Sequence, residues 1–332
     1  MKRGRRTFPG QRQRGAALLL AMVILTLVAT LAAGMVWQQW RAVQVETAER
    51  ARAQAAWILG GGLDWSRLIL REDALSGRAT SLGEPWATPL AETRLSTFLA
   101  VDGDNNVDAG PEVFLSGAIR DAQSRYNLRN LVDAEGKLRP AELAVLESLC
   151  ASAGVAAGTA TVIADGLRAA WAAPGGTDNA AAPLPPAQIG QLVWLGLDAA
   201  SVQRLAPYVD VLPRQTAVNL NTAPREVLAA VIAGLDLGSA ERLVQARQRR
   251  AFATLAEARN ELPPGIALDE SRVTVRSAYF EVNGRLRLED RVLEERSLVE
   301  RRGDRGSEVV ALQRARRTCR ATCREGPPPG SA

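Results

Sequence analysis

A run of 26 residues without a charged side chain, between Arg14 and Arg41, constrains this chain more than any other feature. Residues 16–37 within it are almost continuously apolar. A helix rises 1.5 Å per residue, so about 20 residues cross the hydrocarbon core of a bilayer. The run is long enough to do so. The sequence therefore predicts a single transmembrane helix over residues 16–40.

The charges around this run predict its orientation. The first 14 residues carry six basic groups and no acid, which places the N-terminus in the cytoplasm by the positive-inside rule. The chain would then cross the inner membrane once, with everything after residue 40 in the periplasm. The last 22 residues carry five arginines and one glutamate, which leaves a net charge of −5 for residues 15–310 out of a total of +5. Because a nucleic-acid surface needs positive charge on the folded body, we expect no nucleic-acid partner.

The start of the apolar run predicts how the N-terminus is processed. Polar, basic residues 11–14 end at Gly15, and the apolar run begins at Ala16 without a spacer. This junction resembles the leader of type IV pilins and type II secretion pseudopilins, in which a membrane aspartic peptidase, the prepilin peptidase, cuts after the glycine and methylates the new amine. The resemblance implies a cytoplasmic leader over 1–15, cleavage between Gly15 and Ala16, and N-methylation of Ala16.

Two other interpretations of this N-terminus stay open. One is an ordinary secretory signal, but its apolar region is usually 7–15 residues long and ends in a small-residue cleavage site, and residues 31–34 offer only a weak one. The other is a plain signal anchor that happens to begin after a glycine.

The fifth residue counted from Ala16 is Leu20, where most pilins have glutamate. A carboxylate at membrane depth is costly unless a neighbouring subunit's N-terminal amine compensates it. A subunit with no neighbour above it meets no such amine. Leu20 therefore fits a position at the end of a filament better than one inside it.

Beyond the membrane, two kinds of periodicity predict an α+β head. Alanine-rich residues 41–59 continue as a helix, which the glycines at 60–62 could end or kink, and two separate helices are the alternative. Residues 138–262 have helical character. The strand patterns are those of 112–119, 280–288, 292–299 and 308–312, with Asn283 and Gly284 forming a tight-turn pattern.

We therefore expect an α+β fold with an N-terminal transmembrane helix as a pilin-like stem. Its small antiparallel sheet domain would be split in sequence by an inserted all-α domain of the helix-hairpin-helix or SAM-like type. The expected boundaries are a leader at 1–15, the transmembrane helix at 16–40, a periplasmic helical stem at 41–75, the first part of the head at 76–136, the inserted domain at 137–270, the second part of the head at 271–312 and a disordered basic, proline-containing tail at 313–332. Cys319 and Cys323 in that tail could pair or remain free thiols.

The segment 218–248 has the pattern of a helix-hairpin-helix module, with helices over 225–233 and 239–248. Residues 127–131 look like a degraded earlier copy. DNA-binding versions hold a phosphate at a glycine-rich hairpin and helix N-terminus. Here Asp236 takes the place of the second glycine, where a carboxylate would repel a phosphate. We expect the module to be structural, and a membrane-anchored DNA-binding protein of a DNA-uptake apparatus is the alternative function.

Residues that carry catalytic or metal chemistry are scarce. The chain has no histidine and three cysteines, which excludes His-dependent triads and the usual zinc sites, and it has no G-x-S-x-G motif, so we expect no enzyme. One loop spaces oxygen ligands as calcium loops do, without the central glycine and final glutamate of an EF-hand. Its candidate ligands are Asp102, Asp104, Asn106 and Asp108. Calcium is the one cofactor considered, against a solvated acidic turn.

The pilin-like leader without its glutamate, the split head and the inserted segment with Asn-Leu-Asn-Thr-Ala at 219–223 together resemble the K subunits of the type II (general) secretion pathway, a family of minor pseudopilins. Residues 117–128 look like that family's strand entering the helical domain, and 277–280 look like its return. The similarity covers about residues 10–300. Family members are associated with calcium in acidic loops, but the matching region 165–179 is poor in carboxylates.

This resemblance implies a subunit that caps the pseudopilus tip with the I and J minor pseudopilins. Such a subunit starts pseudopilus assembly and supports protein export across the outer membrane. The implied partners also include the major pseudopilin and the prepilin peptidase, with the secretin and exported proteins as further candidates.

Overall fold

The protein is described from a computed structural model that covers residues 14–95, 112–171, 183–288, 291–303 and 306–320. The chain divides into two compact units, Met1–Ile58 and Leu59–Ala332. The first unit is formed by most of helix α1 (Arg14–Leu75). The second contains the end of α1, a sheet and a group of shorter helices.

Helix α1 is apolar enough to cross a membrane, with a mean hydropathy of 2.6 in its most apolar 18-residue window. All side chains from residue 16 to residue 47 are exposed, as lipid-facing side chains would be. Glycines 60–62 do not end the helix, because α1 continues through them to Leu75, where the predicted helical stem also ends. Each glycine costs a helix about 1 kcal/mol. Burial of Leu59, Leu63 and Leu70 on either side offsets that cost.

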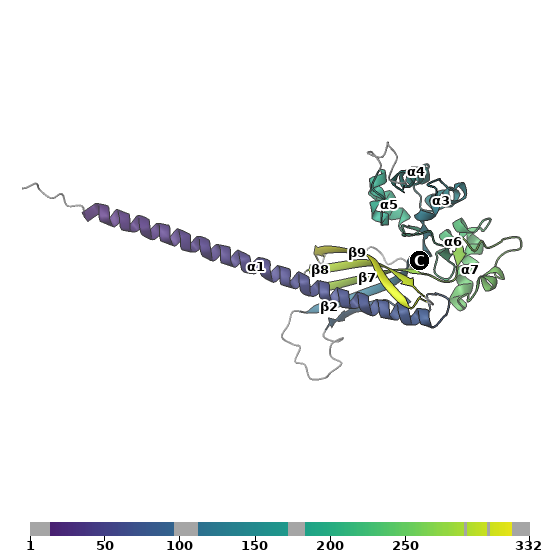
Figure 1. Ribbon diagram of the computed structural model, residues 1–332, viewed down its shortest axis with the longest axis horizontal. Coiled ribbons are helices and arrows are strands. Elements are labelled where there is room, and N and C mark those ends of the chain that lie inside the picture. Colours follow the sequence, from purple (N-terminus) through teal and green to yellow (C-terminus); the bar gives the residue numbers. More distant parts are fainter. Residues whose placement is uncertain (1–13, 96–111, 172–182, 289–290, 304–305, 321–332) are drawn as a thin grey trace, which may run out of the picture. The chain divides into compact units, whose positions relative to one another are not determined.

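The second unit is built on a five-stranded antiparallel sheet with the order β1-β2-β7-β8-β9. Its strands are β1 (Leu90–Arg94), β2 (Val113–Asp121), β7 (Tyr279–Leu288), β8 (Arg291–Arg302) and β9 (Glu308–Arg320). Figure 1 shows β2, β7, β8 and β9 side by side, although more than 150 residues separate β2 from β7 in sequence. The predicted antiparallel sheet is confirmed, and its four predicted strands correspond to β2, β7, β8 and β9.

Two expectations about these strands are wrong. Asn283 and Gly284 do not form a turn, because β7 runs straight through them, with Gly284 opposite Gly117 of β2. The tail does not begin at residue 313, because β9 extends to Arg320. The arginines of this last stretch suggested a solvated tail, but its backbone pairs with β8 through Arg320 opposite Arg291.

Gly284 serves close packing rather than chain reversal. A Cβ built on it would lie 3.0 Å from Cδ2 of Leu59, on the part of α1 that belongs to this unit. We predict that Gly284→Val lowers the free energy of unfolding by about 2 kcal/mol, because the Leu59 side chain must shift out of its packed position. Urea unfolding would measure this loss. Gly190→Val is the control, since nothing lies within 4 Å of a Cβ there, and equal losses would contradict the packing argument.

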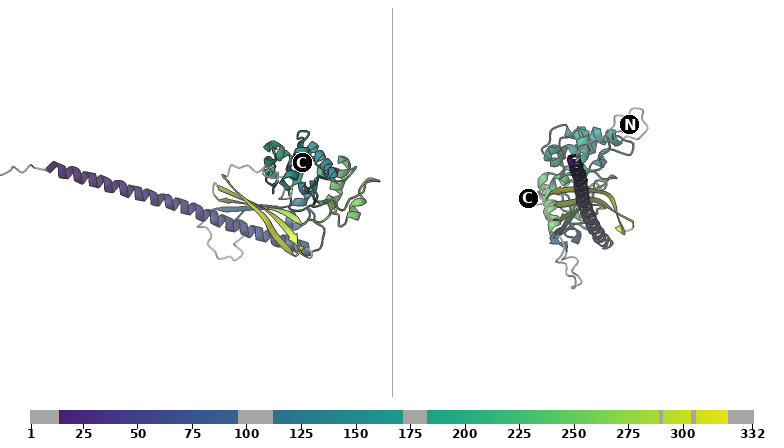
Figure 2. Two further views of the ribbon diagram at one scale, coloured as in Figure 1. Left: turned by 45° about the horizontal axis from the view of Figure 1, so that its top comes forward. Right: turned by 90° about the vertical axis from the view of Figure 1, so that its left-hand side faces the viewer.

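Apart from the end of α1 and the 3-10 helix η1 (Pro85–Ala87), the helices of the second unit lie in sequence between β2 and β7. They are α3 (Pro140–Ser152), α4 (Thr159–Trp171), α5 (Ala199–Leu205), α6 (Arg225–Val231), α7 (Leu237–Arg249) and α8 (Leu255–Arg259), with the 3-10 helices η2 (Ala122–Ser124), η3 (Leu128–Leu131) and η5 (Ile189–Leu195). Figure 2 shows them grouped beside the sheet, in teal and green. Their apolar side chains share one buried core.

The segment between β2 and β7 is not purely helical. It contains two short parallel strand pairs, β3 (Tyr126–Asn127) with β4 (Val209–Asp210) and β5 (Val218–Asn219) with β6 (Val273–Thr274). Three of the four strands are fully buried, so their backbone N–H and C=O groups need internal partners. The first pair joins the beginning of residues 126–210 to their end, and the second pair does the same for residues 218–274.

Candidate functional site

The predicted processing site lies at the beginning of α1. The helix starts at Arg14, which places Gly15 and Ala16 in its first turn. The first backbone N–H groups of a helix have no intrahelical partner, so this turn opens more easily than the turns that follow. Leu20 is 63% exposed in the apolar part of the helix, where it can meet lipid or another subunit.

The end of α1 is fixed on one face of the sheet. Leu63 and Leu70 pack with a cluster that includes Trp86 and Phe280, whose rings meet edge to face with centroids 5.2 Å apart. The Arg301 guanidinium lies 4.3 Å from the Phe280 centroid and 2.6 Å from the buried carboxylate of Asp73, on the last turns of α1. Apolar burial and one shielded ion pair therefore connect the stem to the sheet.

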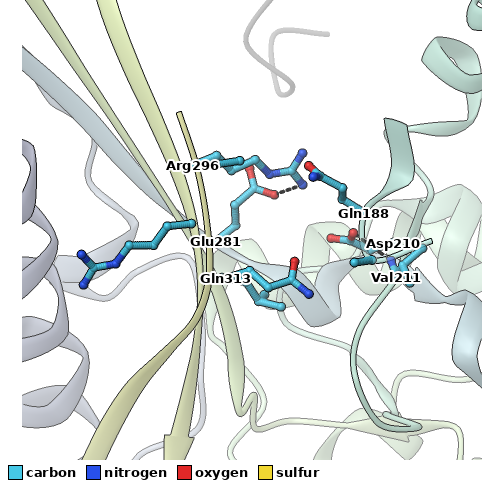
Figure 3. Close-up of a pocket in the computed structure, with 10 residues that line it drawn as sticks. Gln188, Asp210, Val211, Glu281, Arg296 and Gln313 are labelled. Carbon is cyan, nitrogen blue, oxygen red and sulfur yellow. Dashed lines mark hydrogen bonds and ion pairs between the residues drawn. The ribbon is translucent and has the colours of Figure 1, made fainter. Parts of the chain in front are cut away.

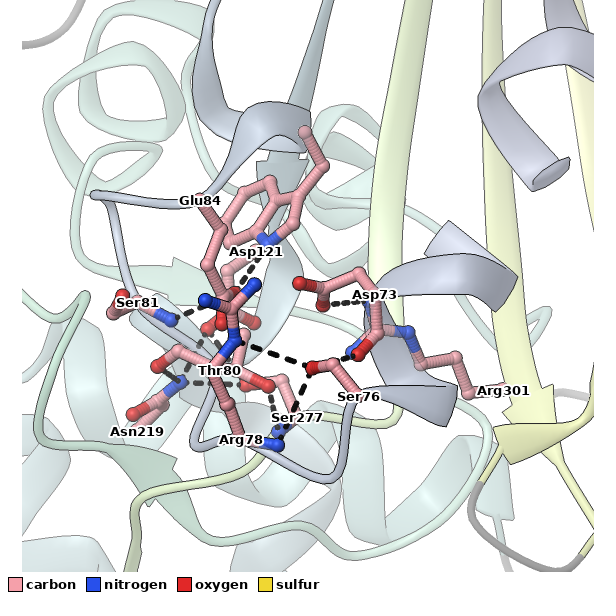
Figure 4. Close-up of polar contacts among 11 residues, drawn as sticks. Asp73, Ser76, Arg78, Thr80, Ser81, Glu84, Asp121, Asn219, Ser277 and Arg301 are labelled. Carbon is pink, nitrogen blue, oxygen red and sulfur yellow. Dashed lines mark hydrogen bonds and ion pairs between the residues drawn. The ribbon is translucent and has the colours of Figure 1, made fainter. Parts of the chain in front are cut away.

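The first polar connection between the sheet and the helical segment centres on Asp121, at the end of β2 (Figure 4). Its buried carboxylate accepts hydrogen bonds from Oγ of Ser277 at 2.6 Å, Oγ1 of Thr222 at 2.6 Å, Nδ2 of Asn219 at 2.9 Å and the backbone N–H of Gln123 at 2.8 Å. Burial raises the pKa of Asp121, and these hydrogen bonds oppose that rise. One carboxylate thus joins β2, the segment beginning at β5 and the approach to β7.

The second polar connection is a buried cluster of four charges. Arg125 lies 2.8 Å from Asp210 and 3.1 Å from Glu281, and Glu281 also pairs with Arg296. Arg125 and Asp210 come from the helical segment, whereas Glu281 and Arg296 come from β7 and β8. Figure 3 shows Glu281 and Arg296 joined on the sheet, with Asp210 across from them.

The carboxylates of this cluster differ in pKa. Burial alone would raise the pKa of Glu281, but the charges of Arg125 and Arg296 and a hydrogen bond from Asn283 lower it to about 2. Burial raises the pKa of Asp210, and Arg125 opposes that rise only in part. Glu281 is therefore the firmly ionised member of the cluster.

A cavity of about 60 Å³ lies beside these charges, with room for a few water molecules. Its walls come from both sides of the connection, and they include Gln188 and Asp210 from the helical segment and Gln313 and Arg314 from β9. Glu281 and Asp210 at this cavity are already paired with Arg125. We therefore interpret it as the hydrated joint between sheet and helices.

The two helices predicted for the helix-hairpin-helix pattern correspond to α6 and α7. The Asp236 carboxylate accepts from the backbone N–H of Ser239 at 2.9 Å and from its Oγ at 2.8 Å. This carboxylate therefore uses a helix N-terminal donor that would hold a phosphate in a DNA-binding version. The geometry gives no support to the DNA-binding alternative.

Sequence reasoning missed a second copy of this cap. Asp198 at the start of α5 accepts from the backbone N–H of Ser201 at 2.8 Å and from its Oγ at 2.6 Å. The signal was available, because Gly-Leu-Asp followed by Ser and Arg at three-residue spacing occurs at 196–204 and again at 234–242. The charge cluster around Arg125 was also missed, and no local motif indicates it.

The predicted calcium ligands at 102–108 lie outside the described residues, so calcium binding there stays a prediction. Within the part of the chain that the structure describes, no group of three His, Cys, Asp or Glu side chains could hold a metal ion. The features that the structure describes are an apolar helix, a stem and a head. Two polar connections, at Asp121 and at Arg125, join the sheet of the head to its helical segment.

An apolar N-terminal helix that continues as a stem packed on an antiparallel sheet defines the pseudopilin class of membrane-anchored subunit. Two family models, both described as type II secretion system protein K, match residues 124–214 and 218–282. The chain is 30% identical over 335 residues to type II secretion system protein K of Pectobacterium carotovorum, covering 91% of this chain and 96% of the relative. This protein belongs to the type II secretion system protein K family and is a minor pseudopilin.

A further relative has the same family name. The chain is 29% identical over 303 residues to the Pseudomonas aeruginosa protein K, covering 84% of this chain and 86% of the relative. Among solved structures, it resembles a chain in the GspK-GspI-GspJ complex from the enterotoxigenic Escherichia coli type 2 secretion system, with a TM-score of 0.60, 21% identity, and coverage of 81% of this chain and 98% of that one. The structural likeness supports the mixed helix-and-sheet fold.

Proposed function

We propose that this protein caps the tip of the pseudopilus in a complex with the I and J minor pseudopilins, where it starts pseudopilus assembly and supports export across the outer membrane. The observation that carries the proposal is similarity to protein K along nearly the whole chain. A chain of similar fold was solved in the GspK-GspI-GspJ complex, which supports the same partners here. The major pseudopilin below the tip is a further partner, and the secretin and exported proteins are candidate contacts.

In this proposal the residues have mechanical roles rather than catalytic ones. Residues 16–40 anchor the subunit in the inner membrane, with the leader in the cytoplasm and the head in the periplasm. The stem transmits the position of the anchor to the sheet. The inserted segment 137–270 acts as a helix-hairpin-helix domain used for structure, because its hairpin caps are occupied by Asp198 and Asp236. The two polar joints hold that domain on the head.

The complex itself provides the direct test. We expect the full chain, co-expressed with the I and J minor pseudopilins of its own organism and extracted in a neutral detergent, to elute with both as one species in size exclusion. Expressed alone, it should form no filament. Separate elution of the three subunits at tens of micromolar would contradict the tip complex.

The tip position is tested at Leu20. Leu20→Glu places a carboxylate at membrane depth, at a cost of roughly 2.5–3.5 kcal/mol on the translocon scale. If no subunit above supplies an amine, we expect weaker assembly and weaker secretion. Leu27→Glu in the same exposed stretch is the matched control, and both variants should be impaired alike. Improved secretion with Leu20→Glu alone would indicate an interior subunit and refute the tip assignment.

A further inference from the structure

The outer edge of the sheet is an unpaired strand. β9 bonds to β8 on one side, and among the described residues no other backbone group bonds to β9. The opposite edge strand, β1, has five residues, whereas β9 has thirteen. A free edge presents a row of N–H and C=O groups that can accept an additional strand.

The second half of β9 is exposed, although Arg314 and Ala315 also line the cavity beside Glu281. Residues 314–318 are all exposed, whereas a strand with one covered face would alternate between buried and exposed residues. The register irregularity of β9 lies before this stretch, so its pairing with β8 is regular from Arg314 to Thr318. An added strand would meet an uninterrupted ladder there.

The charge of this edge selects its partner. Residues 309–320 contain four arginines and no carboxylate. Arg316 pairs with Glu295 at 2.5 Å, but Arg314 and Arg317 make no ion pair with any residue that the structure describes. Glu294 of β8 lies opposite Arg317 of β9 in the strand register. Its carboxylate forms an ion pair with Arg285 at 3.7 Å. The exposed half of the edge therefore carries uncompensated positive charge.

A second copy of the same strand is a poor occupant. Two β9 strands side by side would bring arginines close to arginines, and like charges on facing strands are destabilising. An extended segment with carboxylates would instead supply both the missing backbone partners and the opposite charge. Edge arginines also discourage aggregation, which is the competing explanation of the same side chains.

We propose that residues 314–318 of β9 bind an extended, carboxylate-rich segment of a partner protein, which adds to the sheet as a sixth strand. The proposal is independent of the tip assignment, because it rests on the sheet edge and its charge. It predicts that backbone pairing and charge attraction are both required for binding.

The test uses the full chain in a neutral detergent and a labelled peptide, Thr-Glu-Val-Glu-Val-Glu-Thr, followed by fluorescence anisotropy. A second peptide with both valines replaced by proline has the same charge but cannot pair as a strand. The protein variant is Arg314→Glu with Arg317→Glu. Its matched control is Arg249→Glu with Arg250→Glu, two exposed arginines at the end of α7. Thermal melting establishes that both variants are folded.

We expect the first peptide to bind the unmodified chain and to slow hydrogen exchange of backbone amides within 314–318. The β9 variant should bind it at least tenfold more weakly, whereas the α7 variant and the unmodified chain should bind equally. The proline peptide should not bind. Absence of binding by the first peptide, equal binding of the proline peptide, or unchanged exchange at β9 would each overturn the proposal and leave edge protection as the role of these arginines.

Discussion

Replacing Gly15 with valine is expected to leave the chain uncut and unmethylated in cells with an active prepilin peptidase. A peptidase needs an extended backbone at the bond it cuts, and α1 begins at Arg14, one residue before Gly15. Glycine in this first turn is readily unwound and adds no side chain in the peptidase cleft. Valine is branched at Cβ and obstructs the same bond.

Intact-mass measurement of the membrane-extracted protein checks this result. The unmodified chain should begin at a methylated Ala16, and Gly15→Val should retain all fifteen leader residues. Gly10→Val is the control within the leader, and it should still be cut. An uncut unmodified chain, or normal cleavage of Gly15→Val, would remove the support for a pilin-like leader.

The sequence predicted those parts of the fold that depend on local pattern. Period-two alternation predicted β7, and a short apolar run between turn residues predicted β2. At two places packing overrides the local preference of the residues. Gly284 suggested a turn but is needed beneath Leu59, and glycines 60–62 suggested a break but lie in a helix that is packed on the sheet.

The joints between sheet and helical segment could not be predicted in the same way. Arg125 meets Asp210 and Glu281 across 85 and 156 residues of sequence, so no spacing rule relates them. Asp121 lay within the stretch that resembled the family's entry strand, but its four donors come from three separate segments. The extent of β9 was missed because its arginines are typical of a solvated tail, whereas its pairing depends on β8.

Glu281→Gln is expected to lower the free energy of unfolding by about 3 kcal/mol at pH 7. The pKa of Glu281 falls from an ordinary 4.5 to about 2 in the folded chain, and each unit corresponds to about 1.4 kcal/mol. Glutamine keeps the shape of the side chain but leaves Arg296 without its carboxylate and Arg125 with Asp210 alone. Loss of one partner from a buried ion pair has a cost of this order.

The pH dependence distinguishes this electrostatic effect from a packing defect. A carboxylate whose folded pKa is depressed stabilises the fold above its unfolded pKa and loses that contribution as the pH falls through the folded one. The gap between Glu281→Gln and the unmodified chain should therefore be full above about pH 5 and close between 4.5 and 2. Burial is the largest cause of the raised pKa of Asp210 and acts in both proteins, whereas the smaller contribution from the charge of Glu281 is lost in the variant.

Urea unfolding of the full chain in a neutral detergent, repeated across this pH range, measures that gap. Glu294→Gln on the neighbouring strand β8 is the matched control, because its carboxylate is 39% exposed and lies 3.7 Å from Arg285. Such exposed pairs contribute about 0–1 kcal/mol. A Glu281 effect no larger than that of Glu294, or one that stays constant down to pH 2.5, would contradict the view that a buried charge cluster holds the helical segment on the sheet.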